Sequence, residues 1–118
     1  QSGWSPAQEL GHLIDLEPLW LARVHDIVEG RQELTVADLS NRATHEGDHA
    51  RWPLDALATR FTIERARLVA ALRALTPDDL DRAARHPRLG TPMRAIDLAY
   101  FVAEHDDHHL ARLRAGNS

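Results

Sequence analysis

Residues 91–114 read TPMRAIDLAYFVAEHDDHHLARLR, and this stretch decides the fold class. It opens with Thr91-Pro92, a capping residue followed by proline, which is a common start of an α-helix. Between Ala95 and Ala103 the stretch is apolar apart from one aspartate, as expected of a helix that is covered on more than one side. The stretch therefore predicts a long, largely buried helix from Thr91 to about Arg114.

Two more long helices are predicted upstream of this one. Ser5-Pro6-Ala7-Gln8 combines an N-cap serine, a proline in the first turn and a capping-box glutamine, and apolar residues follow at helical spacing as far as Gly30. A leucine-rich stripe of helical period runs from Leu54 to Leu75. Between them, residues 31–53 form a long polar connection, in which 35–39 are expected to make one short helical turn.

The remaining segments are short and add no sheet. Thr76-Pro77 is expected to start a short helix that continues to about Arg85, and residues 86–90 form a turn. No segment shows the alternation expected of a strand, and no internal repeat is visible. The sequence thus predicts an all-α fold, an up-down helical bundle, with residues 1–118 as a single domain.

Composition narrows the function classes. The longest apolar run, residues 98–103, is far shorter than the roughly 20 residues that span a bilayer, so no membrane association is expected. The chain does not open like a signal peptide, which favours a cytoplasmic location. The net charge of −4 argues against a nucleic-acid partner, because such proteins usually carry a basic face.

The chain contains neither cysteine nor lysine. Disulfides, thiolate metal sites, a cysteine nucleophile, Schiff-base chemistry and a phosphate-loop lysine are therefore excluded. Eight histidines in 118 residues remain to be explained.

Three of these histidines form a candidate metal site. His105 and His109 are four residues apart on the last predicted helix, so their side chains lie one turn apart on the same face. That face also carries Leu98 and Phe101, and a helical wheel places His12 on the apolar face of the first helix. Three inward imidazoles without cysteine suggest one divalent ion with open coordination positions, as in catalytic sites.

The sequence also resembles the DinB/YfiT-like superfamily of helical bundle proteins. Three stretches carry the resemblance: Trp4-Ser5-Pro6 to Leu13; the pattern from Phe61 to Leu80; and Gly90-Thr91-Pro92 to Leu110, with its His-Asp-Asp-His-His motif. In that family the histidine after the Trp-Ser motif and both outer histidines of the later motif bind the metal. The resemblance therefore implies that His12, His105 and His109 are the metal ligands.

The resemblance implies a bundle of four long helices, often dimeric, and for several relatives a reaction that uses a low-molecular-weight thiol. Two features depart from the family pattern. Arg112 stands where a glutamine often follows the motif, and only Gln1 to Gly3 precede Trp4, so the family's first long helix is expected to be missing from this chain.

We therefore expect a metal-dependent enzyme, a thiol-dependent transferase or a hydrolase, acting on a small-molecule substrate. Imidazole ligands favour zinc or nickel, with iron or manganese as further options. A metal-binding stress or scaffold protein without catalysis is one alternative. A di-iron carboxylate bundle is another, because Glu9-x-x-His12 and Glu46-x-x-His49 both have the Glu-x-x-His spacing of such sites.

Several other polar residues have two interpretations each. The cluster His45-Glu46-Gly47-Asp48-His49 is expected in a solvated loop, or else as a substrate contact if that loop folds over the site. His108 is expected at the rim of the site. Asp106 either supports a ligand imidazole or lies on a solvated face, and Arg23 either pairs with a core carboxylate or neutralises an anionic substrate. His25 and His86 are expected to be exposed.

The last predicted helix has a second apolar face. Ile96, Ala99, Ala103 and Leu110 lie roughly opposite the histidine face. The other helices of one chain cover only one of the two faces, and an uncovered apolar face usually marks an interface. A homodimer is therefore expected, unless a helix preceding Gln1 covers this face.

Overall fold

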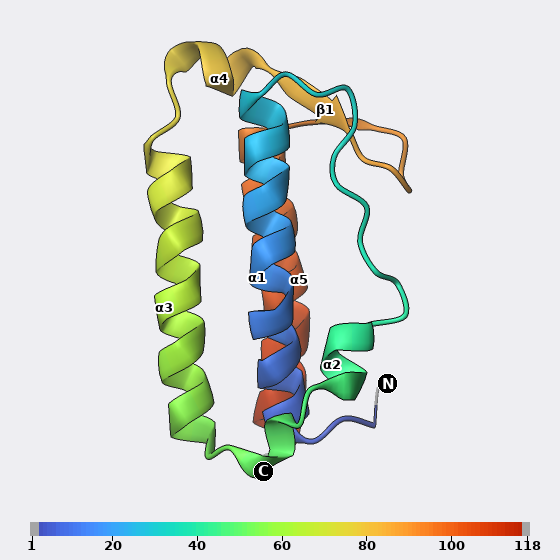
Figure 1. Ribbon diagram of the computed structural model, residues 1–118, viewed down its shortest axis with the longest axis vertical. Helices are drawn as coiled ribbons and strands as arrows, with labels where there is room; N and C mark the ends of the chain where they lie inside the picture. Colours follow the sequence, from blue (N-terminus) through green and yellow to red (C-terminus); the bar gives the residue numbers. More distant parts are fainter. Residues whose placement is uncertain (1–2, 117–118) are drawn as a thin grey trace.

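The computed structural model describes residues 3–116, without the side chains of residues 115 and 116, so residues 1–2 and 117–118 of the predicted domain lie outside the described part. Three long helices dominate, namely α1 (Pro6–Val28), α3 (Leu54–Arg73) and α5 (Ala95–Gly116) (Figure 1). The shorter elements are α2 (Arg42–Glu46), the 3-10 turn η1 (His49–Arg51), α4 (Pro77–Asp81), β1 (Ala83–Arg85) and β2 (Pro92–Arg94). The prediction of a helical bundle is confirmed.

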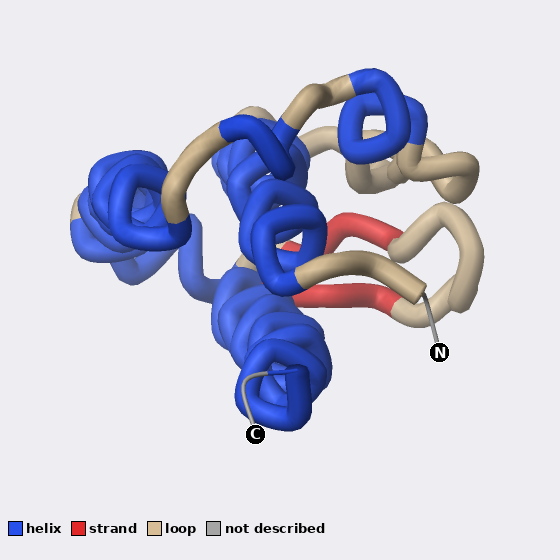
Figure 2. The backbone as a smooth tube through the Cα atoms, turned by 90° about the horizontal axis from the view of Figure 1, so that it is seen from below, coloured by secondary structure: helices blue, strands red, loops and turns tan. Residues whose placement is uncertain are grey.

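Helix α1 is the central element of the bundle. Helices α3 and α5 both pack against α1, on different sides of it (Figure 2). The connection that follows α1 and the β1–β2 hairpin lie on the side of the bundle away from α3 (Figure 2). Helix α1 is therefore covered along most of its circumference, and most of its polar residues are placed between elements instead of in solvent.

The start of α1 is determined by local capping. The Ser5 hydroxyl accepts a hydrogen bond from the Gln8 backbone N–H at 3.2 Å, and the Ser5 N–H donates to the Gln8 side chain at 2.9 Å. Each bond satisfies a donor that the first turn would otherwise leave unpaired. At the other end Gly30 adopts a positive φ of 74°, which costs glycine little. Both predicted ends of this helix are confirmed within two residues.

The hydrophobic core runs along the seam between α1 and α5. Trp20, Val24 and Ile27 of α1 pack with Leu98 and Val102 of α5, and all five are buried. Burying a side chain of this kind contributes roughly 1.5–3 kcal/mol. The seam therefore holds the two histidine-bearing helices in a fixed relation.

One buried ionic cluster joins all three long helices. Arg65 of α3 donates two hydrogen bonds to the Glu17 carboxylate of α1, at 2.9 and 2.8 Å, and its Nη1 lies 2.6 Å from Asp106 Oδ2 of α5. Burial alone would lower the pKa of Arg65, but the hydrogen bonds and charges of Glu17 and Asp106 raise it overall. We call Glu17, Arg65 and Asp106 the Arg65 cluster.

The expectation that no segment forms a strand is wrong in one place. Residues 83–85 and 92–94 form a two-stranded antiparallel sheet, with Ala84 paired to Met93. Both of these residues are buried against the core. Strands of only three residues are too short to show a recognisable alternation in sequence.

This hairpin also shifts two predicted helix boundaries. The short helix ends at Asp81, well before Arg85, and the last helix begins at Ala95, three residues after the Thr91-Pro92 pair. The Asp97 carboxylate accepts a hydrogen bond from the Arg94 backbone N–H at 2.9 Å, which caps the helix at its observed start. The turn predicted for residues 86–90 joins the two strands.

The connection between α1 and α3 also differs from the prediction. Residues 35–39 are not helical, and the helical turn of this region lies at 42–46. In the part of the chain that the structure describes, no helix is both long enough and apolar enough to cross a membrane.

Candidate metal centre

Three imidazoles from two helices meet between α1 and α5. Each of His12, His105 and His109 offers one ring nitrogen, and these three nitrogens lie within 4.8 Å of one another. His12 and His109 are buried and His105 is partly buried. Within residues 3–116 this is the only group of three or more His, Asp or Glu side chains whose ligand atoms lie that close. We call these residues the histidine cluster.

A hydrogen-bond chain orients His12. Its Nδ1 lies 3.0 Å from the Thr44 hydroxyl, and that hydroxyl donates to Asp15 Oδ2 at 2.8 Å. Since the Thr44 proton is used on Asp15, the Thr44 oxygen accepts from His12 Nδ1–H. This leaves the lone pair of His12 on Nε2, as a metal ligand requires.

His49 completes this chain from the other side. Its Nε2 lies 2.9 Å from Asp15 Oδ2, so Asp15 is bonded to both Thr44 and His49. The ring of His49 packs directly on Gly11 of α1, where an added Cβ would clash with it. A glycine one residue before His12 is therefore needed for the close approach of the connection to this helix.

His109 is oriented by a buried carboxylate. Its Nδ1 lies 2.6 Å from Glu9 Oε1, and the Arg112 guanidinium approaches the other oxygen of Glu9 at 3.9 Å. A carboxylate that accepts from the second ring N–H is the usual support of a metal-bound histidine. Arg112, which departs from the family pattern, is thus placed against the support of His109.

His105 has a buried ring nitrogen without a partner. In the part of the chain that the structure describes, its Nδ1 is solvent-inaccessible and makes no hydrogen bond. A buried polar atom in this state costs free energy unless another group satisfies it. A third imidazole with an unpartnered ring nitrogen beside two oriented ones fits a cation bound between the rings.

The protonation state of the cluster also fits a cation. Burial, together with charge repulsion from His109 and His105, lowers the pKa of His12 to about 4. Burial and the charge of His109 lower the pKa of His105 to about 4 as well. Both rings are therefore neutral at pH 7, which is the form that binds metal ions.

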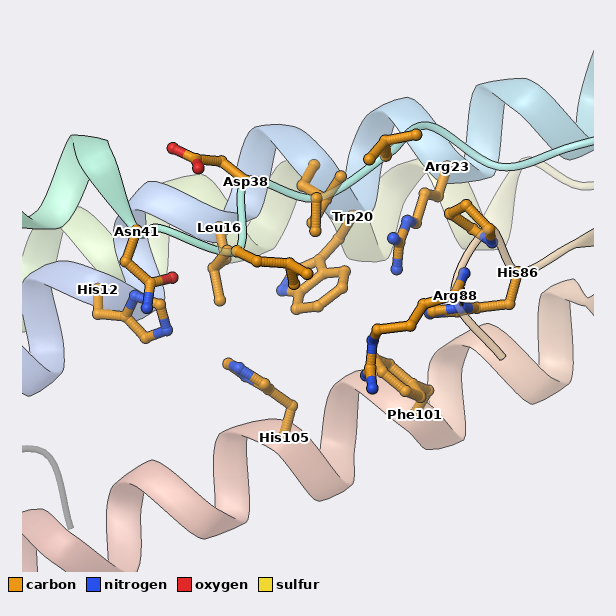
Figure 3. A pocket seen from close by; sticks show the side chains of 15 residues that line it. His12, Leu16, Trp20, Arg23, Asp38, Asn41, His86, Arg88, Phe101 and His105 are labelled. Carbon is orange, nitrogen blue, oxygen red and sulfur yellow. Dashed lines mark hydrogen bonds between the residues drawn. The ribbon is translucent and has the colours of Figure 1, made fainter. Parts of the chain in front are cut away.

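A cavity of about 560 Å³ opens from the cluster into the protein. His12 and His105 form one end of it, Leu16 and Trp20 line its middle, and Arg23, His86, Arg88 and Phe101 lie toward the other end (Figure 3). A second opening, of about 500 Å³, reaches all three histidines from the surface and is lined by Trp4, His45 and His108. The cluster is therefore reachable from two directions.

The predicted loop cluster divides into different environments. His45 lines the surface opening, and His108 lies at its rim as predicted. Glu46 is exposed and pairs with Arg42 at 3.2 Å, and Asp48 is exposed. The prediction of a solvated loop is wrong for His49, which is buried because its ring is held between Gly11 and Asp15.

Two further predictions from sequence fail because packing buries the residue. His86 is not exposed but buried beside Phe101, with ring centroids 5.5 Å apart. Asp106 lies neither on a solvated face nor on a ligand imidazole, since Arg65 binds it. His25 is exposed, as expected.

Sequence reasoning missed most of the supporting residues. No local pattern marks Thr44 and Asp15, because the contacts that bring Thr44 to His12 and to Asp15 join residues about 30 positions apart in sequence. Glu9 was noted only for its spacing to His12. Its position one turn before His12, on the same buried face, is the signal that would have pointed to it.

The comparisons with known proteins agree with this fold. The fold is similar to the solved structure of YfiT from Bacillus subtilis, described as a probable metal-dependent hydrolase with an unusual four-helix bundle topology. The TM-score is 0.76 at 21% identity, and the match covers 96% of this chain and 65% of that chain. This chain thus spans less than two thirds of the length of that structure. No curated protein sequence gave a significant match. The family model of the DinB superfamily matches residues 1–113, and the chain belongs to that superfamily.

Proposed function

We propose that this chain is a metal-dependent enzyme that holds one divalent cation on His12, His105 and His109 and acts on a small-molecule substrate. The observation that carries the proposal is the convergence of the three imidazole nitrogens within 4.8 Å at one end of a cavity of about 560 Å³. A cavity of this volume is in the usual range for small-molecule sites. The net charge of −4 makes a nucleic-acid substrate the weaker option.

The residues around the cluster have separable roles. Thr44 and Glu9 accept hydrogen bonds from two of the imidazoles and hold their other nitrogens toward the common centre. Leu16, Trp20 and Phe101 form an apolar wall beside it, which limits the access of bulk water. A divalent cation in such a site supplies Lewis acidity, which brings the pKa of a water or thiol toward neutrality.

Two reaction types are compatible with this arrangement. In a hydrolase the nucleophile is water, and in a transferase it is a low-molecular-weight thiol. The chain has no cysteine, so a thiol must arrive with the cosubstrate. Zinc and nickel suit three imidazoles best, and iron and manganese remain further options.

Two alternative functions are less well supported. The di-iron proposal needs a second carboxylate and histidine at the centre, but Glu46 pairs with Arg42 on the surface and His49 is bonded to Asp15. A metal-binding protein without catalysis would not need the apolar cavity that adjoins the cluster. Turnover decides between that protein and an enzyme.

The direct test is metal analysis combined with a turnover screen. We expect about one zinc or nickel ion per chain, and the loss of this ion in His12→Ala, His105→Ala and His109→Ala. The exposed His25 of α1 provides the control, His25→Ala, which should keep the metal. Full metal content in any of the three ligand variants would refute the assignment.

The turnover screen separates the two reaction types. Metal-dependent hydrolysis of esters or amides without thiol supports a hydrolase, and metal-dependent conjugation of a small thiol to an electrophile supports a transferase. Both activities should disappear in His105→Ala. A metal-loaded protein without either activity would favour the non-catalytic alternative.

We further propose that two copies of the chain associate through the outer face of α5. Ile96 and Leu110 are exposed on this face, and an apolar groove between α3 and α5 is lined by Ala99, Ala103 and Val69. Sedimentation velocity should detect a dimer at micromolar concentration, and Ala103→Glu should convert it to a folded monomer. A monodisperse wild-type monomer would contradict this proposal.

A further inference from the structure

The end of the 560 Å³ cavity that lies away from the histidine cluster is strongly basic. Arg23 of α1 and Arg88 of the hairpin turn both line this end, and they lie near each other and near His86 (Figure 3). Each arginine is placed close enough to lower the pKa of His86, after the effect of burial. Two guanidinium groups thus face one apolar cavity.

Arg23 is among the most deeply buried side chains of the molecule, with 2% of its surface exposed. Its Nε donates to the backbone oxygen of Thr35 at 3.0 Å, and its guanidinium lies 5.7 Å from the Trp20 ring centre. Among the described residues no carboxylate lies at ion-pair distance from it. The sequence left two interpretations of Arg23 open. The structure therefore does not show the one in which Arg23 pairs with a core carboxylate.

The nearest acidic groups are already engaged. Burial lowers the pKa of Arg23, and the charge of Asp26 only partly opposes this effect. The Asp26 carboxylate accepts two hydrogen bonds from Thr35, at 2.6 and 2.7 Å. Asp38 also belongs to the cavity wall, and its carboxylate accepts hydrogen bonds from Ser40 and from the Arg42 backbone. Neither carboxylate is placed to neutralise both arginines.

His86 adds an oriented neutral donor. Its Nδ1 accepts hydrogen bonds from the backbone N–H groups of Arg88 at 3.2 Å and Leu89 at 3.0 Å. The remaining proton of the neutral ring is therefore on Nε2. This end of the cavity thus offers a buried guanidinium without a carboxylate partner, a second guanidinium and an N–H donor. Groups of this kind bind anions.

We propose that the substrate is amphiphilic, with an anionic group, a carboxylate or a phosphate, bound by Arg23 and Arg88. Its apolar body lies along Leu16, Trp20 and Phe101, and its reacting group reaches the histidine cluster. The inference rests on the proposed function, because it places the reacting group of the substrate at the candidate metal centre. Binding of the anionic end, however, depends only on the arginine end of the cavity.

The test uses the metal-free protein and three probes of equal alkyl length, namely hexanoate, hexyl phosphate and 1-hexanol. Dissociation constants are measured by NMR titration at constant ionic strength. We expect at least one of the two anions to bind about tenfold tighter than the alcohol, since a hydrogen bond to a charged group is stronger than one to a neutral group. The anion with the larger advantage identifies the chemistry of the natural group.

Two variants examine the source of this preference. Arg88→Gln changes an exposed side chain and should preserve the fold, while it reduces the anion preference about threefold to tenfold and leaves hexanol binding unchanged. Arg23→Gln should abolish the preference, provided that thermal unfolding shows a folded protein. The matched control is Arg94→Gln, an exposed arginine of β2 outside the cavity, which removes the same charge.

The outcomes separate this inference from the proposed function. Equal binding of hexanoate, hexyl phosphate and hexanol, or the same loss in Arg88→Gln and Arg94→Gln, would overturn it. It would also be overturned by an anion preference that appears only after zinc is added and survives Arg88→Gln, because the anion would then bind the metal. An anion preference that depends on Arg88 in a protein without metal affinity would support the subsite and refute the metal centre.

Discussion

Two buried polar clusters share helix α5 and differ in how their charges are balanced. In the Arg65 cluster one guanidinium binds two carboxylates, so every charge has an opposite partner supplied by the chain. In the histidine cluster three imidazoles face one another, and the pKa values of His12 and His105 fall to about 4. Asp106 belongs to the first cluster and His105, its neighbour in sequence, to the second.

The two clusters also differ in whether the chain itself supplies partners for their polar groups. The Arg65 cluster contains its own counter-charge, although Asp106 Oδ1 has no hydrogen-bond partner among the described residues, and it ties α1, α3 and α5 together. In the histidine cluster, burial and charge repulsion lower the pKa values of His12 and His105, and a buried ring nitrogen of His105 has no hydrogen-bond partner in the described part of the chain. We therefore expect substitutions in the first cluster to affect folding and substitutions near the second to affect cation binding.

The largest effect is expected from Arg65→Met. Removing this guanidinium leaves Glu17 and Asp106 buried without a counter-charge, which should lower the free energy of unfolding by about 3–5 kcal/mol. Urea unfolding followed by circular dichroism measures the loss. The control on the same helix is Arg67→Met, whose exposed pair with Glu64 should contribute less than about 1 kcal/mol. Equal losses in the two variants would show that the buried cluster does not stabilise the bundle.

A second prediction concerns the support of the histidine cluster. Glu9→Gln keeps the shape of the side chain but removes the charge that faces His109, and should weaken zinc affinity about 10- to 100-fold. Competition with a chromogenic chelator measures the affinity. Glu29→Gln makes the same change at an exposed position at the other end of α1 and should have no effect. If both variants bind zinc like the wild type, Glu9 does not support a metal ligand.

Per pH unit, the smallest effect is expected in the pH dependence of the metal-free protein. The native pKa values of His12 and His105 lie near 4, below the 6.5 of an unfolded chain. Between these values the unfolded state binds more protons, so the free energy of unfolding falls as the pH falls below 6.5 and is unaffected above it. His105→Leu should reduce the slope of the free energy of unfolding against pH by the equivalent of about one proton, which is about 1.4 kcal/mol per pH unit.

Urea midpoints at several pH values between 4 and 7 test this prediction. The same series with zinc is the control, because bound metal keeps the rings deprotonated until protons displace it. An identical slope in the wild type and in His105→Leu would contradict the assignment of a buried neutral ring to His105.

Much of the framework was predictable because helices leave a local signature. The cap at Ser5 and the leucine period of residues 54–75 marked two of the three long helices to within two residues. The i, i+4 spacing of His105 and His109 put both rings on one face whatever the rest of the chain does. The hairpin at 83–94 was missed, because its strands are stabilised by burial of Ala84 and Met93 and not by a local pattern.

By itself, the sequence determined the helical class, the inward histidine face of α5 and the absence of thiol ligands, since each depends on composition or on residues a few positions apart. Only the tertiary structure decided which groups support the imidazoles, that Asp106 belongs to Arg65, and that Arg23 faces a cavity without a carboxylate partner at ion-pair distance among the described residues. The physical reason is separation along the chain. The bond between Glu9 and His109 joins residues 100 positions apart, and such a contact has no period in the sequence that could reveal it.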